Sequence, residues 1–320
     1  MTPRERFLKT LHCEPIGGQT PTFELEFQLT MEAFGRLHPG QRNYRRWDQM
    51  SRAEQRLHLA DLAQLYVDIA RRYDHSAILV LHPGAGGVSA FQELLEDIRE
   101  KSGDAFCLLA HGDPTWAIPD GDTMMDFSIR MYEEPEALNE QSQRRLERAL
   151  SDAAFYSSHG HLLDGFALCS DYCFNVNPFF SPEQFDQFIT PYLRAVIDGY
   201  REMGYCTIKH TDGNIMPIVR QMASCRPDAI HSLDPQGGVT IPAVREAIGD
   251  QIALIGNVNC ALLQTGSEEA CRADILRSLR EGMARGYGYV FSTSNCAYTG
   301  LPLARYELLN ALWRQYGCYA

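Results

Sequence analysis

The feature that most constrains this chain is a regular alternation of short apolar runs with longer amphipathic stretches. Continuous apolar runs of this length are typical of strands that are buried on both faces of a parallel sheet. The stretches between them carry helix start signals; Ser181-Pro182-Glu183, for example, sets a capping serine and a first-turn proline before an expected helix over 185–200. The eight runs are Pro21–Phe27, Ser76–Leu81, Phe106–Ala110, Gly165–Cys169, Tyr205–Ile208, Ala229–Leu233, Ile252–Ile255 and Tyr289–Phe291.

This alternation, flanked by predicted helices over Arg4–Leu11 and Leu303–Tyr316, favours a closed α/β barrel. An open, doubly wound sheet alternates in the same way, but no Gly-x-Gly-x-x-Gly motif follows the first apolar run. The sequence contains no repeats and no linker. We therefore predict a (β/α)8 TIM barrel that forms a single domain over residues 1–320.

The composition excludes several classes of protein. The net charge of -12 argues against a generic nucleic-acid binder, which would carry a basic stripe. No apolar run approaches the roughly 18 residues of a membrane span, and no apolar stretch of a secretory signal follows the first residues. The 10 cysteines are unclustered, which is typical of reduced thiols. A cytoplasmic location is therefore expected.

Metal-ligating residues follow three of the predicted strands. His210 and Asp212 follow the fifth run, Cys260 follows the seventh, and Cys296 follows the eighth. The carboxyl ends of barrel strands all meet at one mouth, so these side chains are expected to lie together. Thiolate sulfur and imidazole nitrogen are zinc ligands, and three of them leave a position for substrate. The sequence predicts a catalytic zinc site formed by His210, Cys260 and Cys296, with Asp234 as the alternative to His210.

Acidic residues are the expected catalytic groups at the same mouth. Asp212 is interpreted as an acid/base or orienting group, although Asp-Gly is also a common turn. Glu24 and Glu26 share one face of the first run, and two acids facing a barrel interior cost several kcal/mol unless they are paired or bind a metal. Asp171 ends the fourth run. Asp212, Glu24 and Asp171 are therefore predicted to be catalytic.

The two longest irregular segments, 112–130 and 170–180, each follow a strand and are expected to cover the mouth. Their aromatic residues are suited to a substrate pocket, although packing within the loops is an equally good explanation for any one of them. The expected substrate contacts are Trp116, Tyr172, Phe174 and His111.

Several motifs resemble the uroporphyrinogen decarboxylase-like superfamily. They are His210-Thr211-Asp212-Gly213-Asn214, Gly256-Asn257-Val258 and the stretch from Leu262 to Glu269, preceded by Pro3-Arg4-Glu5-Arg6-Phe7 and Phe180-Ser181-Pro182-Glu183-Gln184-Phe185. The matches are spread along the chain and keep their order. The fold implied by this resemblance is also a β/α barrel.

The superfamily contains porphyrinogen decarboxylases and zinc-dependent methyltransferases that work with corrinoid proteins. The decarboxylases carry an Arg-Gln-Ala-Gly-Arg stretch near the N-terminus, where this chain has the acidic segment Pro21–Phe27. Such a segment would repel a polyanionic porphyrinogen. The resemblance therefore favours the methyltransferase branch.

Within that branch, enzymes that use coenzyme M carry His-x-Cys on strand five and Cys on strand eight. This chain matches them at His210 and Cys296 but has Asp212 instead of the first cysteine. Enzymes that act on aromatic methyl ethers have more varied ligands. Both Asp234 and His210, each taken with Cys260 and Cys296, fit that variation.

The resemblance implies a zinc-dependent O-demethylase component. It would move a methyl group from a small donor, an aromatic methyl ether, to the Co(I) corrinoid (cobalamin) of a partner protein that docks at the barrel mouth, and the enzyme could form a homodimer. The alternatives are transfer from a methyl-corrinoid protein to a thiol and a metal-free lyase of the decarboxylase type. A barrel without enzymatic activity is disfavoured by the many ionisable residues at the strand ends.

Overall fold

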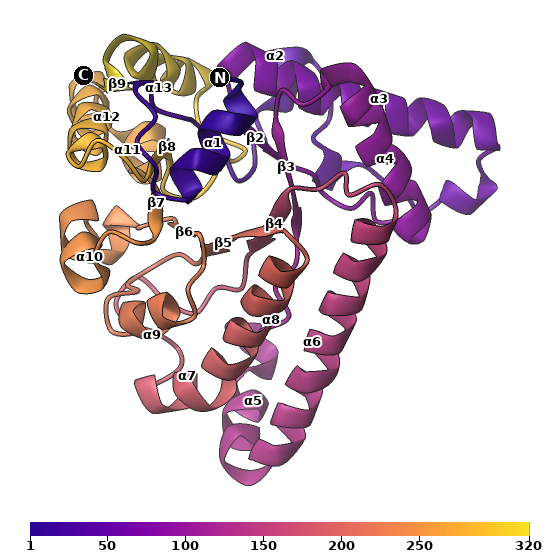
Figure 1. Cartoon of the computed structure of the whole chain (residues 1–320), viewed down its shortest axis with the longest axis vertical. Coiled ribbons are helices and arrows are strands. Elements are labelled where there is room, and N and C mark those ends of the chain that lie inside the picture. Colours follow the sequence, from indigo (N-terminus) through magenta and orange to yellow (C-terminus); the bar gives the residue numbers. More distant parts are fainter. Residues whose placement is uncertain (320) are drawn as a thin grey trace.

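The computed structural model describes residues 1–319, and its centre is a curled parallel sheet (Figure 1). Each of its seven strands pairs with the next strand along the chain. All seven overlap predicted runs, so the mixed α/β fold and the parallel sheet are confirmed. The strands are β2 (Ala77–Leu79), β3 (Cys107–His111), β4 (Gly165–Leu168), β5 (Cys206–His210), β6 (Ala229–His231), β7 (Ala253–Val258) and β8 (Tyr289–Thr293).

The first predicted strand, 21–27, is not a regular strand. Thr22 forms an isolated parallel bridge with Phe291 of β8, and Phe27 forms one with Ala297. On the other side, the backbone N–H of Ser76, just before β2, donates to the Thr22 carbonyl at 2.8 Å. The segment thus runs between β8 and the start of β2 but shares too few hydrogen bonds to be a strand. The described residues form a seven-stranded, half-barrel sheet rather than the eight-stranded barrel that was predicted.

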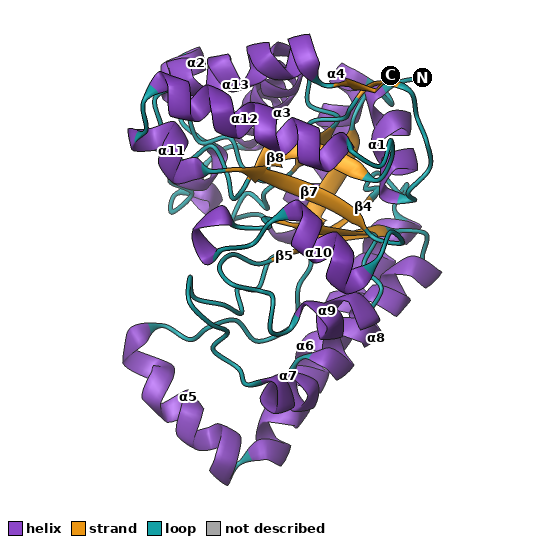
Figure 2. Cartoon of the chain, turned by 90° about the vertical axis from the view of Figure 1, so that its left-hand side faces the viewer, coloured by secondary structure: helices purple, strands orange, loops and turns teal. Residues whose placement is uncertain are grey.

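Helices cover the outer face of the sheet, and α5 with the adjoining part of α6 projects away from it (Figures 1 and 2). A separate two-stranded sheet joins β1 (Gly18–Gln19) to β9 (Cys318–Tyr319) in antiparallel pairing. Within residues 1–319, no helix is both long and apolar enough to cross a membrane. The helices are α1 (Pro3–Leu11), α2 (Thr30–Phe34), α3 (Arg52–Tyr73), α4 (Gly87–Ser102), α5 (Gly121–Glu133), α6 (Pro135–Ser158), α7 (Pro182–Phe188), α8 (Thr190–Glu202), α9 (Val219–Ser224), α10 (Ile241–Ile248), α11 (Cys260–Thr265), α12 (Glu268–Met283) and α13 (Leu303–Tyr316).

The helix predictions are correct at both ends of the chain and wrong in two places between them. The helix expected over 185–200 is divided into α7 and α8 at Ile189, next to Pro191. Proline has no N–H to donate and clashes with the preceding helical turn, so it starts a new helix here. The segment 112–130, expected to be irregular, contains most of α5.

Successive strand residues point alternately into the curled sheet and out to the helices. This alternation divides the core into two layers. The side chains of β5 alternate in the same way. His210 therefore faces the interior, on the same side as Ile208, whereas Lys209 faces outward. The interior layer includes Leu79, Leu109, Ile208, Ile255 and Val290 and is covered at its base by Phe7 and Leu11 of α1. The outer layer includes Val80, Ala110, Phe166, Leu254 and Phe291.

Candidate metal centre

Three potential metal ligands meet at the carboxyl end of the sheet. Asp171, His210 and Asp212 each offer one ligand atom, and these atoms all lie within 4.8 Å of one another. The Nε2 atom of His210 is 3.8 Å from Oδ1 of Asp171 and 3.8 Å from Oδ1 of Asp212. One imidazole nitrogen and two carboxylates are ligands that zinc accepts.

The pairing of β4 with β5 explains why these residues meet. Leu168 is opposite Lys209, so the residues that follow the two strands leave the sheet side by side. The backbone N–H of Asp212 also donates to Oδ1 of Asp171 at 3.2 Å. The parallel sheet thus brings together two carboxylates that are 41 residues apart in sequence.

The imidazole of His210 is held by a second histidine. Its Nδ1 atom lies 2.8 Å from Nδ1 of His231 in β6, and both rings are buried. Burial lowers the pKa of His210 to about 3 and places the pKa of His231 well below its usual value. Both rings are therefore neutral near pH 7. With Nδ1 engaged by His231, Nε2 of His210 points toward the carboxylates, the arrangement that a second-shell partner gives to a metal-binding histidine.

Asp212 is the most strongly constrained acid of the cluster. Its Oδ1 accepts a hydrogen bond from Ser232 Oγ at 2.7 Å, and its Oδ2 accepts one from the Asn295 amide. Burial, together with the nearby Asp171 and Asp234, raises its pKa to about 7. Two neighbouring carboxylates repel each other when both are ionised, and a bound cation compensates this repulsion.

The turn after β6 positions Ser232. Both Ser232 and Leu233 have positive φ, 93° and 52°. Such backbone conformations are uncommon for residues other than glycine and cost about 1–3 kcal/mol each. Ser232 Oγ is also within hydrogen-bond distance of the Ser294 carbonyl oxygen, so the strained turn joins the ends of β5, β6 and β8 around Asp212.

Cys260 and Cys296 lie near each other, but not in the cluster. Cys260 Sγ is 3.8 Å from the Cys296 carbonyl oxygen and accepts a hydrogen bond from Ser294 Oγ at 3.6 Å. Burial raises the pKa of Cys260 to about 11 and also raises that of Cys296. Among residues 1–319, neither thiol belongs to a group of three close ligand atoms. The set of His210, Cys260 and Cys296 stays a prediction, and the structure instead groups His210 with two aspartates.

Glu24 does not face the sheet interior, contrary to the expectation for the first run. Phe23 and Leu25 occupy the interior layer, and alternation turns Glu24 toward the helices. Its carboxyl group accepts hydrogen bonds from Thr293 N at 3.2 Å and from Thr293 Oγ1 at 2.6 Å. Burial raises its pKa to about 8. A catalytic role for Glu24 stays a prediction.

Asp234, the alternative third ligand, caps a short turn. Its side chain accepts hydrogen bonds from the backbone of Gln236 at 2.9 Å and of Gly213 at 3.4 Å. These bonds occupy both carboxylate oxygens. Asp234 acts on the cluster through its charge, since it lies outside the group of close ligand atoms.

The four expected substrate contacts are in different environments. The indole of Trp116 donates to Ser142 Oγ at 2.7 Å and packs against α5 and α6. Tyr172 is fully buried, and its ring lies 4.0 Å below the Lys209 ammonium. Phe174 is 41% exposed, and His111 is exposed at the end of β3. Trp116 and Tyr172 therefore pack within the protein, whereas Phe174 and His111 remain accessible.

The sequence analysis missed His231, Ser232 and Asn295, which complete the surroundings of the cluster. His231 shares the interior face of β6 with Ala229, so the period of two within that strand could have indicated it. Ser232 and Asn295 carried no signal in sequence beyond their closeness to strand ends.

The comparisons with known proteins agree with the family resemblance. Residues 171–316 match the family model described as Uroporphyrinogen decarboxylase (URO-D). This range contains the three clustered ligands and both cysteines of the predicted zinc site. Over residues 171–316, the resemblance to the uroporphyrinogen decarboxylase-like superfamily is thereby confirmed. No curated protein sequence matches this chain.

Solved structures show the same fold. A methyltransferase from Methanosarcina mazei is 17% identical, has a TM-score of 0.74, and matches 99% of this chain and 99% of its own. A GH5_18 protein from Streptomyces cattleya, in complex with Manb1-4GlcNAc, is 12% identical, with a TM-score of 0.50 over 93% of this chain and 80% of its own. At these identities the similarity defines the fold alone.

Proposed function

We propose that this protein is a zinc-dependent methyltransferase. Its methyl donor is a small aromatic methyl ether, and the acceptor is the Co(I) corrinoid of a partner protein. The observation that carries the proposal is the cluster of Asp171, His210 and Asp212. The description of the Methanosarcina mazei protein as a methyltransferase, over the full length of both chains, adds support for the class of reaction.

The donor set fits a zinc ion. His210 is neutral because burial lowers its pKa. In the tautomer in which its Nδ1–H donates to His231, the Nε2 lone pair is available to a metal without loss of a proton. Asp171 and Asp212 supply the negative charge that balances a divalent ion, and the ion would counteract both the burial and the neighbouring charges that raise the pKa of Asp212. Asp171 is half exposed, which leaves an open side for the substrate.

Zinc at this cluster supplies a Lewis acid for the ether oxygen, which stabilises the negative charge that develops on the leaving phenolate. The chain's own residues orient that centre: His231 fixes the ring of His210, and Ser232 and Asn295 fix the two oxygens of Asp212. Phe174 and His111, both exposed, are the groups available to contact an aromatic ring. The buried Tyr172 and the packed Trp116 support the loops beneath.

The activity is tested anaerobically with zinc-loaded protein, a methoxyphenol and chemically reduced cobalamin as the methyl acceptor. Methylcobalamin is followed by its absorbance and the released phenol by chromatography. We expect both products to form in equal amounts, and His210→Ala to abolish them. His159→Ala is the matched control, because His159 is an exposed histidine at the end of α6 that packs on Phe155. Equal turnover by wild type and His210→Ala would contradict the proposal.

The place of the two thiols is tested separately. Cys296→Ala that keeps one zinc per chain would leave Asp171, His210 and Asp212 as the ligands. Loss of zinc in both Cys260→Ala and Cys296→Ala would place thiolates in the shell, as the sequence predicts. His210 belongs both to the clustered set and to the predicted set with Cys260 and Cys296, whereas only the alternative set with Asp234 lacks it.

A further inference from the structure

A cavity lies between the sheet and its helices, and none of the three clustered metal ligands lines it. It has a volume of about 470 Å³. Val80, Ala110 and Phe166 form its floor, and all three belong to the outer layer of the core. The clustered His210 faces the opposite, interior side of the same sheet. His111, at the end of β3, does line the cavity. A ligand here would therefore lie apart from the metal ligands and would share only His111 with the proposed methyl-transfer site.

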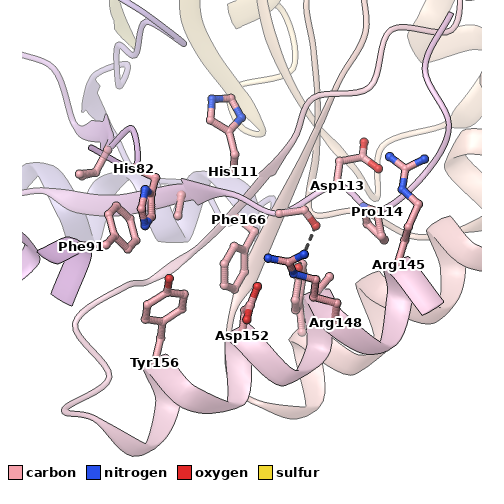
Figure 3. Close-up of a pocket in the computed structure, with 15 residues that line it drawn as sticks. His82, Phe91, His111, Asp113, Pro114, Arg145, Arg148, Asp152, Tyr156 and Phe166 are labelled. Carbon is pink, nitrogen blue, oxygen red and sulfur yellow. Dashed lines mark hydrogen bonds between the residues drawn. The ribbon is translucent and has the colours of Figure 1, made fainter. Parts of the chain in front are cut away.

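The walls of the cavity are aromatic and held in fixed positions. The His82 ring stacks on Phe91 at 5.4 Å between centroids, and Phe91 packs against Tyr156 at 5.5 Å. Phe166 stacks on Tyr200 at 4.1 Å. Figure 3 shows Phe91, Tyr156 and Phe166 on one side of the ribbon that carries His111, with His111 pointing to the other side. Such surfaces favour a flat apolar ligand.

One end of the cavity is cationic. Arg145 and Arg148 of α6 both line it, and Arg145 lies 4.4 Å from the Trp116 ring. Within residues 1–319, neither guanidinium forms an ion pair, although the chain has 41 acidic and only 29 basic residues. The nearby carboxylate of Asp113 already accepts hydrogen bonds from Lys209 and Thr115. The two arginines are thus free to bind an anion.

A third polar group limits the choice of ligand. Asp152 lies one helical turn beyond Arg148 and also lines the cavity, and Figure 3 shows both beneath Phe166. Its carboxylate repels a second anionic group but accepts a hydrogen bond from a hydroxyl. A flat ring with one carboxylate toward the arginines and a hydroxyl toward Asp152 satisfies all of these groups. A guanidinium binds a carboxylate with two parallel hydrogen bonds.

We propose that this cavity is a binding site for a planar aromatic carboxylate. The site contains none of the clustered metal ligands, so we expect carboxylate binding not to require zinc. Its volume lies within the range of about 300–1,000 Å³ that is usual for small-molecule sites. Arg148 supplies the charge recognition, and the rings of Phe166 and Tyr156 supply the apolar contact.

The test is isothermal titration of the whole protein with 6-hydroxy-2-naphthoate and with the uncharged 6-(hydroxymethyl)-2-naphthol. We expect the carboxylate to bind at least about tenfold more tightly than the alcohol, since a charge-assisted hydrogen bond contributes that much. Arg148→Gln should remove this difference. Arg144→Gln should not, because Arg144 is exposed on the same helix and pairs with Glu140 at 3.8 Å.

A second variant tests the location without changing charge. Ala149 lines the cavity, and Ala149→Phe should fill it and weaken binding of both compounds at least about tenfold. Three results would overturn the proposal: no binding of the carboxylate, equal binding by wild type and Arg148→Gln, or unchanged binding by Ala149→Phe. The last two would place the ligand elsewhere on the protein.

Discussion

Lys209 is the residue whose replacement gives the sharpest prediction about stability. Its ammonium is fully buried and donates to Asp113 Oδ2 at 2.7 Å and to the carbonyls of Leu168 and Ser170 at 3.0 and 2.9 Å. Burial alone would raise the pKa of Asp113, but Lys209 holds it below its usual value. The pair joins the loop after β3 to the loop after β4, which carries Asp171.

Each single variant should lower the free energy of unfolding because it leaves one buried charge without its partner. Lys209→Met leaves the Asp113 carboxylate in a site where only 5% of its side chain is exposed. Breaking a buried ion pair in this way lowers the free energy of unfolding by about 3–5 kcal/mol. Asp113→Asn leaves the ammonium unpaired and should cost a similar amount. The double variant removes both charges, so we expect it to lose at least about 2 kcal/mol less than the sum of the single variants.

Urea unfolding at pH 7, followed by tryptophan fluorescence, measures these free energies. Lys9→Met is the matched control, because Lys9 is half exposed and lies 3.8 Å from Glu14. It should change stability by no more than about 0.5 kcal/mol. A cost below about 1 kcal/mol for Lys209→Met, or a double variant that equals the sum, would refute the reasoning.

Three further predictions concern buried groups. Burial lowers the pKa of His75 to about 3, so the folded state favours the neutral imidazole. The contribution of His75 to the free energy of unfolding is complete above the unfolded pKa of about 6.5. It is lost as the pH falls toward 3, at up to about 1.4 kcal/mol per pH unit. His75→Gln should flatten this loss in urea midpoints measured from pH 4 to 7, and an unchanged slope would contradict the assignment. Burial raises the pKa of Glu24 to about 8, so the contribution of Glu24 to the free energy of unfolding is complete below pH 4.5 and is lost as the pH rises to 8. Glu24→Gln should make the free energy of unfolding less dependent on pH over that range. A steeper dependence would exclude a protonated Glu24. Gly165→Ala should lower the thermal unfolding midpoint, because its Cβ would lie 2.2 Å from the Cys206 carbonyl oxygen, at a cost of about 1–3 kcal/mol or more. Gly121→Ala, with open space around its Cβ, is the control, and equal midpoints for the two variants would show that the sheet relaxes.

The sequence predicts the sheet well because each strand carries its own signal. Apolar runs mark β2 to β8, and capping residues mark α1 and α3, where Thr2 and Ser51 both form capping boxes. The segment 21–27 was also expected to be a strand, but it lacks regular pairing, which depends on its neighbours and not on its own residues. Pairing between distant segments is the part of the fold that local patterns do not specify.

The candidate site was predicted to the level of strand ends. His210, Asp171 and Asp212 were all placed at the mouth, and the structure brings them together. The choice between Asp212 and the cysteines depends on where side chains point after a strand ends, which strand periodicity does not determine. The orienting partner His231 is set by the register of β5 against β6, in which His210 lies opposite His231.

The metal content of the purified protein tests the central claim most directly. Inductively coupled plasma mass spectrometry should find about one zinc per chain in wild type and in His159→Ala, and little in His210→Ala, since both proposed ligand sets require this imidazole. The circular dichroism spectrum of His210→Ala should match that of wild type, which separates loss of metal from loss of fold. Absence of zinc from wild-type protein after reconstitution under reducing conditions, or full zinc in His210→Ala, would contradict the account.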